Sequence, residues 1–599
     1  MAVLPISSPL RVLIASILVL CGSMTEGFAQ SHETILRALR DEAQRSMRDV
    51  RLPGVPAPYY VEYSVVDRTE YHIRAQFGTL AEAQQRSDRS LNSSVRVGTP
   101  KVDNTNFFDV GLGFFGSSDD EESFLNRRVA LDADYNALRR ELWLATDAAF
   151  KQSAEIFAKK NAALQNRAEQ DSLPDFVVLP PERRIDTSSA PVFSMAEWQR
   201  IVTEVSAIAK QFPALQNSAV NIEYIPERRY FVSSEGREYV KLSISCGIEI
   251  IASTQAGDGM PLANTYSVYA KSPAQLPSLD SLKKVMTELC TTLTRLTKAP
   301  KLDAYSGPVL FEGQAAGELF AQGFLPYLPT QRPMLAERGM PDNQRNTAFQ
   351  NKIGGRVLPE FMSVTAKPTV EEFVNGTQHV SLFGSYKIDD DGIPAESPTI
   401  VDKGYLRTLL SSRIPHKRIK KSNGHQRGGA PMFGVIDISA ERTKQFSSAE
   451  LKKRLLKLCK DRELPFGIIV RKAINPNILY TTLFGLTGGD FPVMRGEGIM
   501  SLIEVYKVYA DGKEELIRGA EAAGIVPQTF KDILALSKQK TAYNFYALSV
   551  TPSFFTGGAQ FLSASIITPD VMIEDMEIRS LDGNFSKPPI AGHPHFDKR

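Results

Sequence analysis

The sequence of 599 residues contains only four cysteines, so a fold held together by disulfides is excluded. It also lacks an excess of either charge, because 70 Lys and Arg residues stand against 68 Asp and Glu residues, a net charge of +2. This balance argues against a dedicated nucleic-acid binder and against a protein with an acidic tail. With 42% apolar and 23% charged residues, the chain can form sizeable cores and is not wholly disordered. The composition therefore indicates a large globular protein.

One apolar run, at 12–20, follows Arg11 and is too short to span a bilayer as a stable anchor. After it, Gly27-Phe28-Ala29 places small residues where a signal peptidase cleaves, before Gln30. This layout is typical of a secretory signal peptide at 1–29. It predicts an exported protein, periplasmic or secreted after cleavage near Ala29. No other stretch reaches the length of a membrane-spanning helix, so we expect no stable membrane insertion.

Two alternatives for this N-terminal segment stay open. The apolar run could form a buried helix, or Cys21 could carry a lipid, although Leu20 is bulky where a lipidation site needs a small residue. Cleavage leaves an odd number of cysteines, with no CxxC pair: Cys246, Cys290 and Cys459. We expect these three to be buried apolar side chains rather than ligands or nucleophiles.

Hydrophobic periodicity predicts an α+β protein. We expect an N-terminal α/β domain at 30–300 with long helices, and a C-terminal domain at 301–599 rich in mixed or antiparallel β-sheet. Helices are expected at 32–47, 132–169, 195–211, 278–297, 313–323, 449–462 and 528–538. Strands of the second domain are expected at 380–387, 399–410, 434–439, 467–471, 498–509 and 559–567.

Two local signals refine this prediction. Polar and apolar residues alternate over 59–78, which predicts two strands joined near Asp67 and Arg68. Ser447 and Glu450 form a capping box for the helix expected at 449–462.

The sequence contains no HExxH, GxSxG, phosphate-binding loop or paired CxxC motif. No two of its seven histidines lie four residues apart, so no helical His pair is available to bind a metal. His593 and His595 could bind a metal loosely, but a frayed terminus is the favoured interpretation. The acidic run 389–391 before Gly392 lacks the ligand spacing of a calcium loop and is interpreted as a turn. The basic run 416–421 has no interleaved aromatics and is interpreted as a solvated loop.

Several segments, in one order along the chain, resemble the TldD/PmbA family, described as zinc metallopeptidase-related proteins and earlier as modulators of DNA gyrase. The N-terminal match is a strand and turn at 231–236. The match that opens the C-terminal domain is 305–319, which is similar to the family's "G-P-V-L-x…A-A-G-x-L". Further matches are 390–406, 422–427 and 509–521. Relative to the usual family length, 111–190 looks like an insertion that contains the long helix at about 132–169.

The resemblance fails at the zinc motif. Active TldD-type members carry an HExxxH helix with two zinc-binding His residues and a Glu as general base, and a further Cys ligand. Here the two His positions are Gly313 and Glu318, and the Glu position is Gln314. No cysteine occurs near 551–558, where the family's Cys ligand is expected. The sequence therefore predicts no catalytic residue, no cofactor site and no metal site, and places the chain on the PmbA-like side of the family.

Together with the predicted signal peptide, the resemblance implies an exported, metal-free accessory subunit of a peptide-processing assembly. Its partners would be a peptide or unfolded polypeptide and a second subunit, either another copy or an HExxxH-bearing TldD-type paralogue, with no nucleic acid. The alternative is a non-catalytic binding or scaffold protein of the cell envelope that keeps the fold. A third possibility is an enzyme with relocated chemistry, using acidic residues such as Glu312, Glu318 and 389–391. Which peptide is handled is left open.

Overall fold

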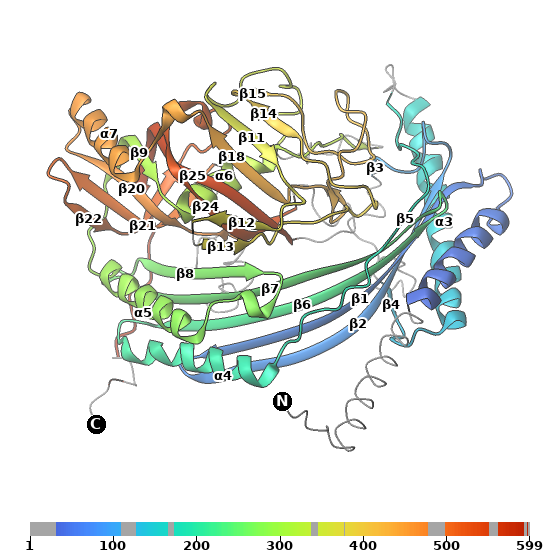
Figure 1. Cartoon of the computed structure of the whole chain (residues 1–599), viewed down its shortest axis with the longest axis horizontal. Coiled ribbons are helices and arrows are strands. Elements are labelled where there is room, and N and C mark those ends of the chain that lie inside the picture. Colours follow the sequence, from blue (N-terminus) through green and yellow to red (C-terminus); the bar gives the residue numbers. More distant parts are fainter. Residues whose placement is uncertain are drawn as a thin grey trace, which may run out of the picture.

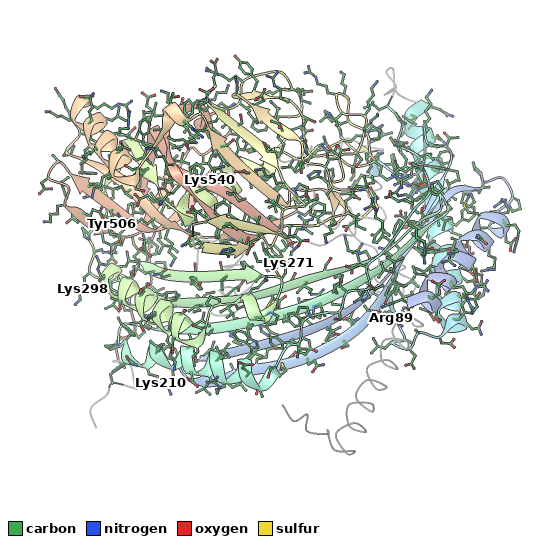
Figure 2. All side chains as sticks on the ribbon, viewed as in Figure 1. Arg89, Lys210, Lys271, Lys298, Tyr506 and Lys540 are labelled. Atoms are coloured by element: carbon green, nitrogen blue, oxygen red, sulfur yellow. The ribbon has the colours of Figure 1, made fainter. Side chains whose placement is uncertain are left out.

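A computed structural model of the chain describes residues 32–108, 127–165, 173–336, 346–376, 378–476, 498–549, 561–591 and Phe596. Two sheets form its two layers (Figure 1), a seven-stranded sheet built from 58–270 and a twelve-stranded sheet built from 304–580. Lys271, directly after the first sheet, lies between the layers (Figure 2). The predicted α+β class is confirmed.

Long antiparallel strands make up most of the N-terminal sheet. They are β1 (Pro58–Gln76), β2 (Thr79–Val97), β6 (Asn217–Ser233), β7 (Arg237–Gln255) and β8 (Pro261–Ala270), with the short strands β4 (Arg127–Val129) and β5 (Glu182–Ile185) beside them.

The predicted break near Asp67 and Arg68 is wrong, because β1 runs through both residues without interruption. Asp67 lies opposite Arg89, and Arg68 lies opposite Asp88 on β2. The guanidinium of Arg89 donates to the carboxylate of Asp67. These charges form cross-strand pairs, so they stabilise the middle of a strand rather than a turn.

The N-terminal sheet has one apolar and one polar face, because successive side chains of a strand point to opposite sides. At one end the apolar residues Ile73, Ile222 and Ile248 pack against α4 (Met195–Ser206) and α5 (Leu279–Leu296). At the other end, α3 (Tyr135–Gln165) and a helix at 32–49 cover the same sheet. The helices lie on the side of the sheet away from the C-terminal domain, so the polar face is turned toward that domain (Figure 1).

Most predicted helices are confirmed. The four at 132–169, 195–211, 278–297 and 313–323 correspond to α3, α4 with a following 3-10 turn, α5, and α6 (Gln314–Gly323). The helix predicted at 449–462 is α7 (Ser448–Asp461), and it begins with the expected capping box of Ser447 and Glu450.

The helix predicted at 528–538 is wrong. A short 3-10 turn (Thr529–Asp532) leads directly into β24 (Ile533–Leu548), which pairs with β25 (Phe561–Ser580). A short apolar run such as the one around Leu536 fits either a helix or a buried strand, and the long neighbouring strand decides between them.

The C-terminal sheet encloses α6 in the largest apolar core of the molecule. Its strands include β9 (Ala304–Phe311), β11 (Met362–Ala366), β18 (Val435–Ala440), β20 (Phe466–Ala473), β21 (Met500–Tyr509), β22 (Glu514–Ile517) and β23 (Ala520–Ala523). The strand predicted at 380–387 is shorter, as β13 (Gln378–Ser381), and the one at 399–410 is divided into β14 (Thr399–Asp402) and β15 (Tyr405–Leu406).

Cys246, Cys290 and Cys459 are buried and free, as predicted. The signal peptide predicted at 1–29, with Cys21, and the histidines at 593 and 595 lie outside the described residues, as does the segment 551–558. Within the residues that the structure describes, no helix combines the length and apolar character needed to cross a membrane.

Candidate functional site

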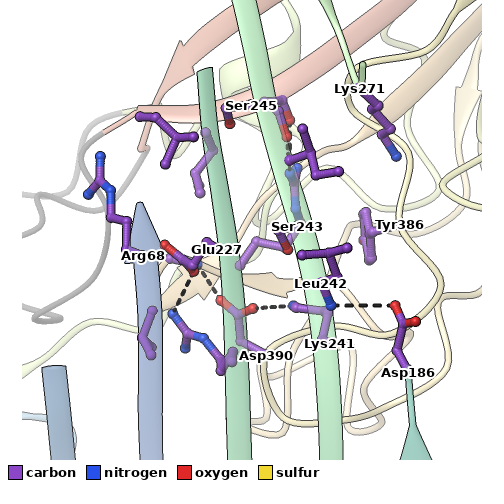
Figure 3. A pocket seen from close by; sticks show the side chains of 18 of the residues that line it. Arg68, Asp186, Glu227, Lys241, Leu242, Ser243, Ser245, Lys271, Tyr386 and Asp390 are labelled. Carbon is purple, nitrogen blue, oxygen red and sulfur yellow. Dashed lines mark hydrogen bonds and ion pairs between the residues drawn. The ribbon is translucent and has the colours of Figure 1, made fainter. Parts of the chain in front are cut away.

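A cavity of about 1590 Å³ lies between the polar face of the N-terminal sheet and the C-terminal domain. We call it the cleft. Every second residue of the long strands lines it, among them Glu62, Ser64 and Arg68 of β1 and Ser90 and Asn92 of β2. The opposite wall comes from 383–391, the hairpin at 426–429 and the ends of β24 and β25. Figure 3 shows part of this wall facing β6 and β7.

An ion pair crosses the cleft and joins its two walls. Lys241 of β7 donates to Asp390 at 2.8 Å (Figure 3), and the other oxygen of that carboxylate accepts from the backbone N–H of Gly428 at 2.7 Å. Burial opposes ionisation of Asp390, but the charges of Lys241 and Arg229 outweigh burial and lower the pKa of its carboxyl group. Asp390 is therefore ionised and already neutralised by the protein.

The run 389–391 forms the predicted turn, with Gly392 at a φ of 72°. Asp389 is fully buried, and its carboxylate accepts hydrogen bonds from the backbone N–H groups of Asp391, Ile393 and Gln426 at 2.8–3.1 Å. A carboxylate that holds its own loop in this way is structural. The predicted turn is confirmed.

Three aromatic side chains from both domains meet in the cleft wall. The rings of Tyr269 and Phe383 stack at 5.3 Å, and Tyr546 meets both rings edge-on at 4.9 and 5.1 Å. Gly247 lies opposite Tyr269 on the neighbouring strand, where a Cβ atom would approach the Tyr269 ring to 2.4 Å. Glycine at this position lets the ring lie flat against the sheet and supply an apolar patch to a polar cavity.

The residues at the zinc-motif positions lie elsewhere, in the core around α6. Glu318 is 1% exposed, accepts hydrogen bonds from the Tyr543 hydroxyl and from Gln322 at 2.7 Å, and is also bonded by the Asn475 side chain. Gln314 exchanges two hydrogen bonds with the backbone of Ala473, at 2.9 and 3.1 Å. No described residue of α6 lines the cleft.

This donor set does not fit zinc, which needs imidazole, thiolate or carboxylate ligands in a tetrahedral cluster. Gln314 and Glu318 lie on one side of the helix, as predicted, but amides and a phenol occupy the remaining positions around them. Over the described ranges no group of three or more His, Cys, Asp or Glu residues is placed to hold a metal ion. The polar groups of α6 form a closed hydrogen-bond network.

Glu318 gives the first testable prediction. Burial raises the pKa of Glu318 from 4.5 to about 7, so the folded protein retains a proton that the unfolded chain releases. The free energy of unfolding therefore falls as pH rises through this window, by on the order of 3 kcal/mol. Glu318→Gln cannot release a proton, so urea unfolding should show a smaller loss of stability in the variant between about pH 5 and 7. Glu223, whose pKa is also raised, titrates in both proteins, so the variant should still lose some stability. Equal losses in both proteins would contradict the assignment to Glu318.

Residues 305–580 match the family model described as the PmbA/TldA metallopeptidase C-terminal domain. This match identifies 305–580 as a C-terminal domain of the TldD/PmbA type. A segment of 70 residues is 36% identical to a metalloprotease of Methanocaldococcus jannaschii, covering 12% of this chain and 14% of that protein. The chain thus spans only a small part of this relative's length in the match.

Solved structures of similar fold align with about nine tenths of this chain. TldE from Thermococcus kodakarensis is 12% identical with a TM-score of 0.56, over 91% of this chain and 100% of TldE. A protein of Thermotoga maritima described as a modulator of a DNA gyrase is 13% identical, also with a TM-score of 0.56, over 90% and 99% of the two chains. These similarities show a shared TldD/PmbA fold.

The acidic residues considered for relocated chemistry do not form one site. Glu312 pairs with Arg471 at 2.9 Å, Glu318 lies in the α6 network, and Asp390 pairs with Lys241. Asp390 and Asp391 line the cleft, whereas Glu312 and Glu318 do not.

Sequence reasoning missed the cleft, including Lys271, Arg427 and the aromatic patch. The alternation over 59–78 held the relevant signal, because it marks a polar face on a strand that the fold turns toward another domain. On the opposite wall, the family-like segments 390–406 and 422–427 include Asp390 and Arg427, but nothing in their sequence indicates that these residues face a cavity.

Proposed function

We propose that this chain is the exported, non-zinc accessory subunit of a peptide-processing assembly, and that its cleft holds an extended polypeptide without cleaving it. The observation that carries the proposal has two parts. The cleft is large and has a mixed polar and aromatic lining, and the polar side chains of α6 are hydrogen-bonded to core residues outside that cleft.

The dimensions and chemistry of the cleft support a peptide as its occupant. Its volume exceeds that of most pockets for small molecules, which hold about 300–1,000 Å³. The long strands supply alternating hydroxyl, amide and charged side chains, and the Tyr269 cluster supplies an apolar surface. Extended peptides are bound in this way, with backbone groups held by polar contacts and alternate side chains taken into pockets.

Hydrolysis would then be supplied by a second subunit. The relatives include a metalloprotease, and a zinc-bearing TldD-type partner would provide the ligands that α6 lacks. We propose this partner as the second subunit of the assembly, and export of the mature chain after cleavage near Ala29.

The test uses the mature chain, alone and co-expressed with an HExxxH-bearing paralogue from the same genome. We expect no peptide hydrolysis by the chain alone in the presence of zinc, and chelator-sensitive hydrolysis by the co-purified pair. Chelator-sensitive hydrolysis by the chain alone would overturn the proposal. A stable homodimer that binds peptide and does not associate with the paralogue would instead support the scaffold alternative.

A further inference from the structure

One corner of the cleft carries two cations that lack a carboxylate partner. Lys271 follows the last residue of β8, and Arg427 lies on the facing hairpin of the C-terminal domain. Among the described residues, neither side chain has a carboxylate oxygen within the 4.0 Å of an ion pair. Nearby cations differ, since Lys241 pairs with Asp390.

Neutral groups of the protein hold both cations in place. The Lys271 ammonium donates to the carbonyl and, at 2.6 Å, to the hydroxyl oxygen of Ser385. Because an ammonium has three N–H donors, the described contacts leave one for a ligand. Ser385 is 6% exposed and is fixed by bonds from its N–H and hydroxyl to the Leu382 carbonyl. Lys271 is thus anchored at a rigid turn.

Arg427 is 9% exposed and is fixed by neutral acceptors as well. It donates to the carbonyl of Phe433 at 2.7 Å and to the carbonyl and hydroxyl of Ser563 at 2.9 Å. Its guanidinium group lies 4.8 Å from the ring centre of Tyr386, which Figure 3 shows close to Lys271.

The electrostatics of this corner favour an anion. Burial lowers the pKa of Lys271 to about 8, with the charges of Arg427 and Lys387 adding to the shift and Glu371 opposing it. Burial also lowers the pKa of Arg427, with Tyr386 and the charge of Asp390 opposing the shift. Glu371 is an incomplete counterion, since it is exposed and pairs with Lys387 at 3.3 Å. A buried charge without a counterion is costly, and an anion between the two cations would relieve that cost.

We propose that Lys271 and Arg427 form a carboxylate-binding corner, which anchors one carboxylate of a peptide held in the cleft. This inference rests on the proposed function and adds to it a rule for substrate choice. Tyr269 and Phe383 lie two residues before Lys271 and Ser385 on their respective segments, and both line the same cleft. An apolar side chain beside the bound carboxylate would therefore meet the aromatic patch.

The test compares fluorescent peptides of Gly, Ser and Ala that end in Phe, by anisotropy with the full mature chain. One probe has a free C-terminal carboxylate, one a C-terminal amide, and one an amide with a single internal Glu. We expect the free acid to bind about tenfold more tightly than the plain amide, the effect of one charge-assisted hydrogen bond. Tight binding of the Glu-containing amide would show that a side-chain carboxylate can occupy the corner as well as a C-terminal one.

Variants assign the effect to the corner. Lys271→Met should bring acid and amide to within about twofold of each other, and Lys271→Arg should keep the preference because it keeps the charge. Lys298→Met is the matched control, since Lys298 is exposed and lies at the α5 end of the molecule, away from Lys271 (Figure 2). It should behave as the unmodified protein. Arg427 is left unchanged because it bonds two backbone carbonyls.

A pH series gives a second readout. The groups around Lys271 are Glu371, Lys387, Arg427 and Tyr386, and burial raises the pKa of Tyr386, which therefore keeps its proton. Above about pH 8 free Lys271 loses its proton, so the preference for the acid should shrink as pH rises and should be constant below about pH 7.

Two results would overturn the inference, and they are distinguishable. Equal binding of acid and amide by the unmodified chain would refute the carboxylate corner and leave the peptide-binding proposal standing. Failure of every probe to bind would refute both. The comparison on the unmodified chain does not depend on whether Lys271→Met folds.

Discussion

Arg413→Met is expected to destabilise the protein by about 3–5 kcal/mol, the cost of leaving one partner of a buried ion pair without the other. Arg413 is 1% exposed and binds both carboxylate oxygens of Glu235, at 2.8 and 2.7 Å. It also donates to the Val177 carbonyl at 2.8 Å, and its guanidinium lies 3.8 Å from the ring centre of Phe176. These contacts join the C-terminal domain to two segments of the N-terminal one.

The measurement is urea unfolding followed by the fluorescence of Trp143 and Trp198, which lie in α3 and α4. Arg407→Met is the matched control, because Arg407 forms an exposed ion pair with Asp402, and such pairs contribute about 0–1 kcal/mol. If the two variants were equally stable, the contacts of Arg413 would not contribute to holding the two domains together.

Ser243→Trp is expected to weaken peptide binding on the order of a hundredfold, an effect of about 3 kcal/mol. Ser243 is exposed on β7, lines the cleft and lies opposite Glu227 of β6 (Figure 3). A tryptophan at this position points into the space assigned to the peptide, and stability should change little because no packed neighbour is displaced.

The matched control is Ser87→Trp. Asp88 and Ser90 of β2 line the cleft, so Ser87 points to the other face of the same sheet, where it is exposed. Peptide anisotropy should find its affinity unchanged. Equal affinity of the Ser243 variant and the unmodified protein would show that peptides bind elsewhere.

The sequence predicted much of the fold because the relevant signals are local. The capping box of Ser447 and Glu450 and the amphipathic pattern of α5 each depend on residues within a few turns of helix. Two failures have non-local causes. Asp67 is stabilised within a strand by Arg89 of another strand, and Leu536 is held in β24 by its pairing with β25.

The cleft was beyond sequence reasoning for the same physical reason. Lys271 and Ser385 are 114 residues apart and meet only because the polar face of one sheet lies against a loop of the other domain. The absence of a zinc motif could be read directly from Gln314 and Glu318, since a metal site depends on residue type. The hydrogen-bond network found there could not be predicted, because it includes Tyr543, which is 225 residues from Glu318 in the sequence.

The most direct test of the central claim, that this protein holds a peptide without cleaving it, is photo-crosslinking with mass spectrometry. An extended peptide with a central photo-reactive residue is incubated with the mature chain and zinc, then irradiated, and both crosslinked sites and peptide length are determined. The account predicts an intact peptide attached to cleft-facing residues of β1, β6 and β7, such as Ser64, Glu227 and Ser243. A shortened peptide whose cleavage a chelator prevents, or crosslinks confined to surfaces outside the cleft, would contradict it.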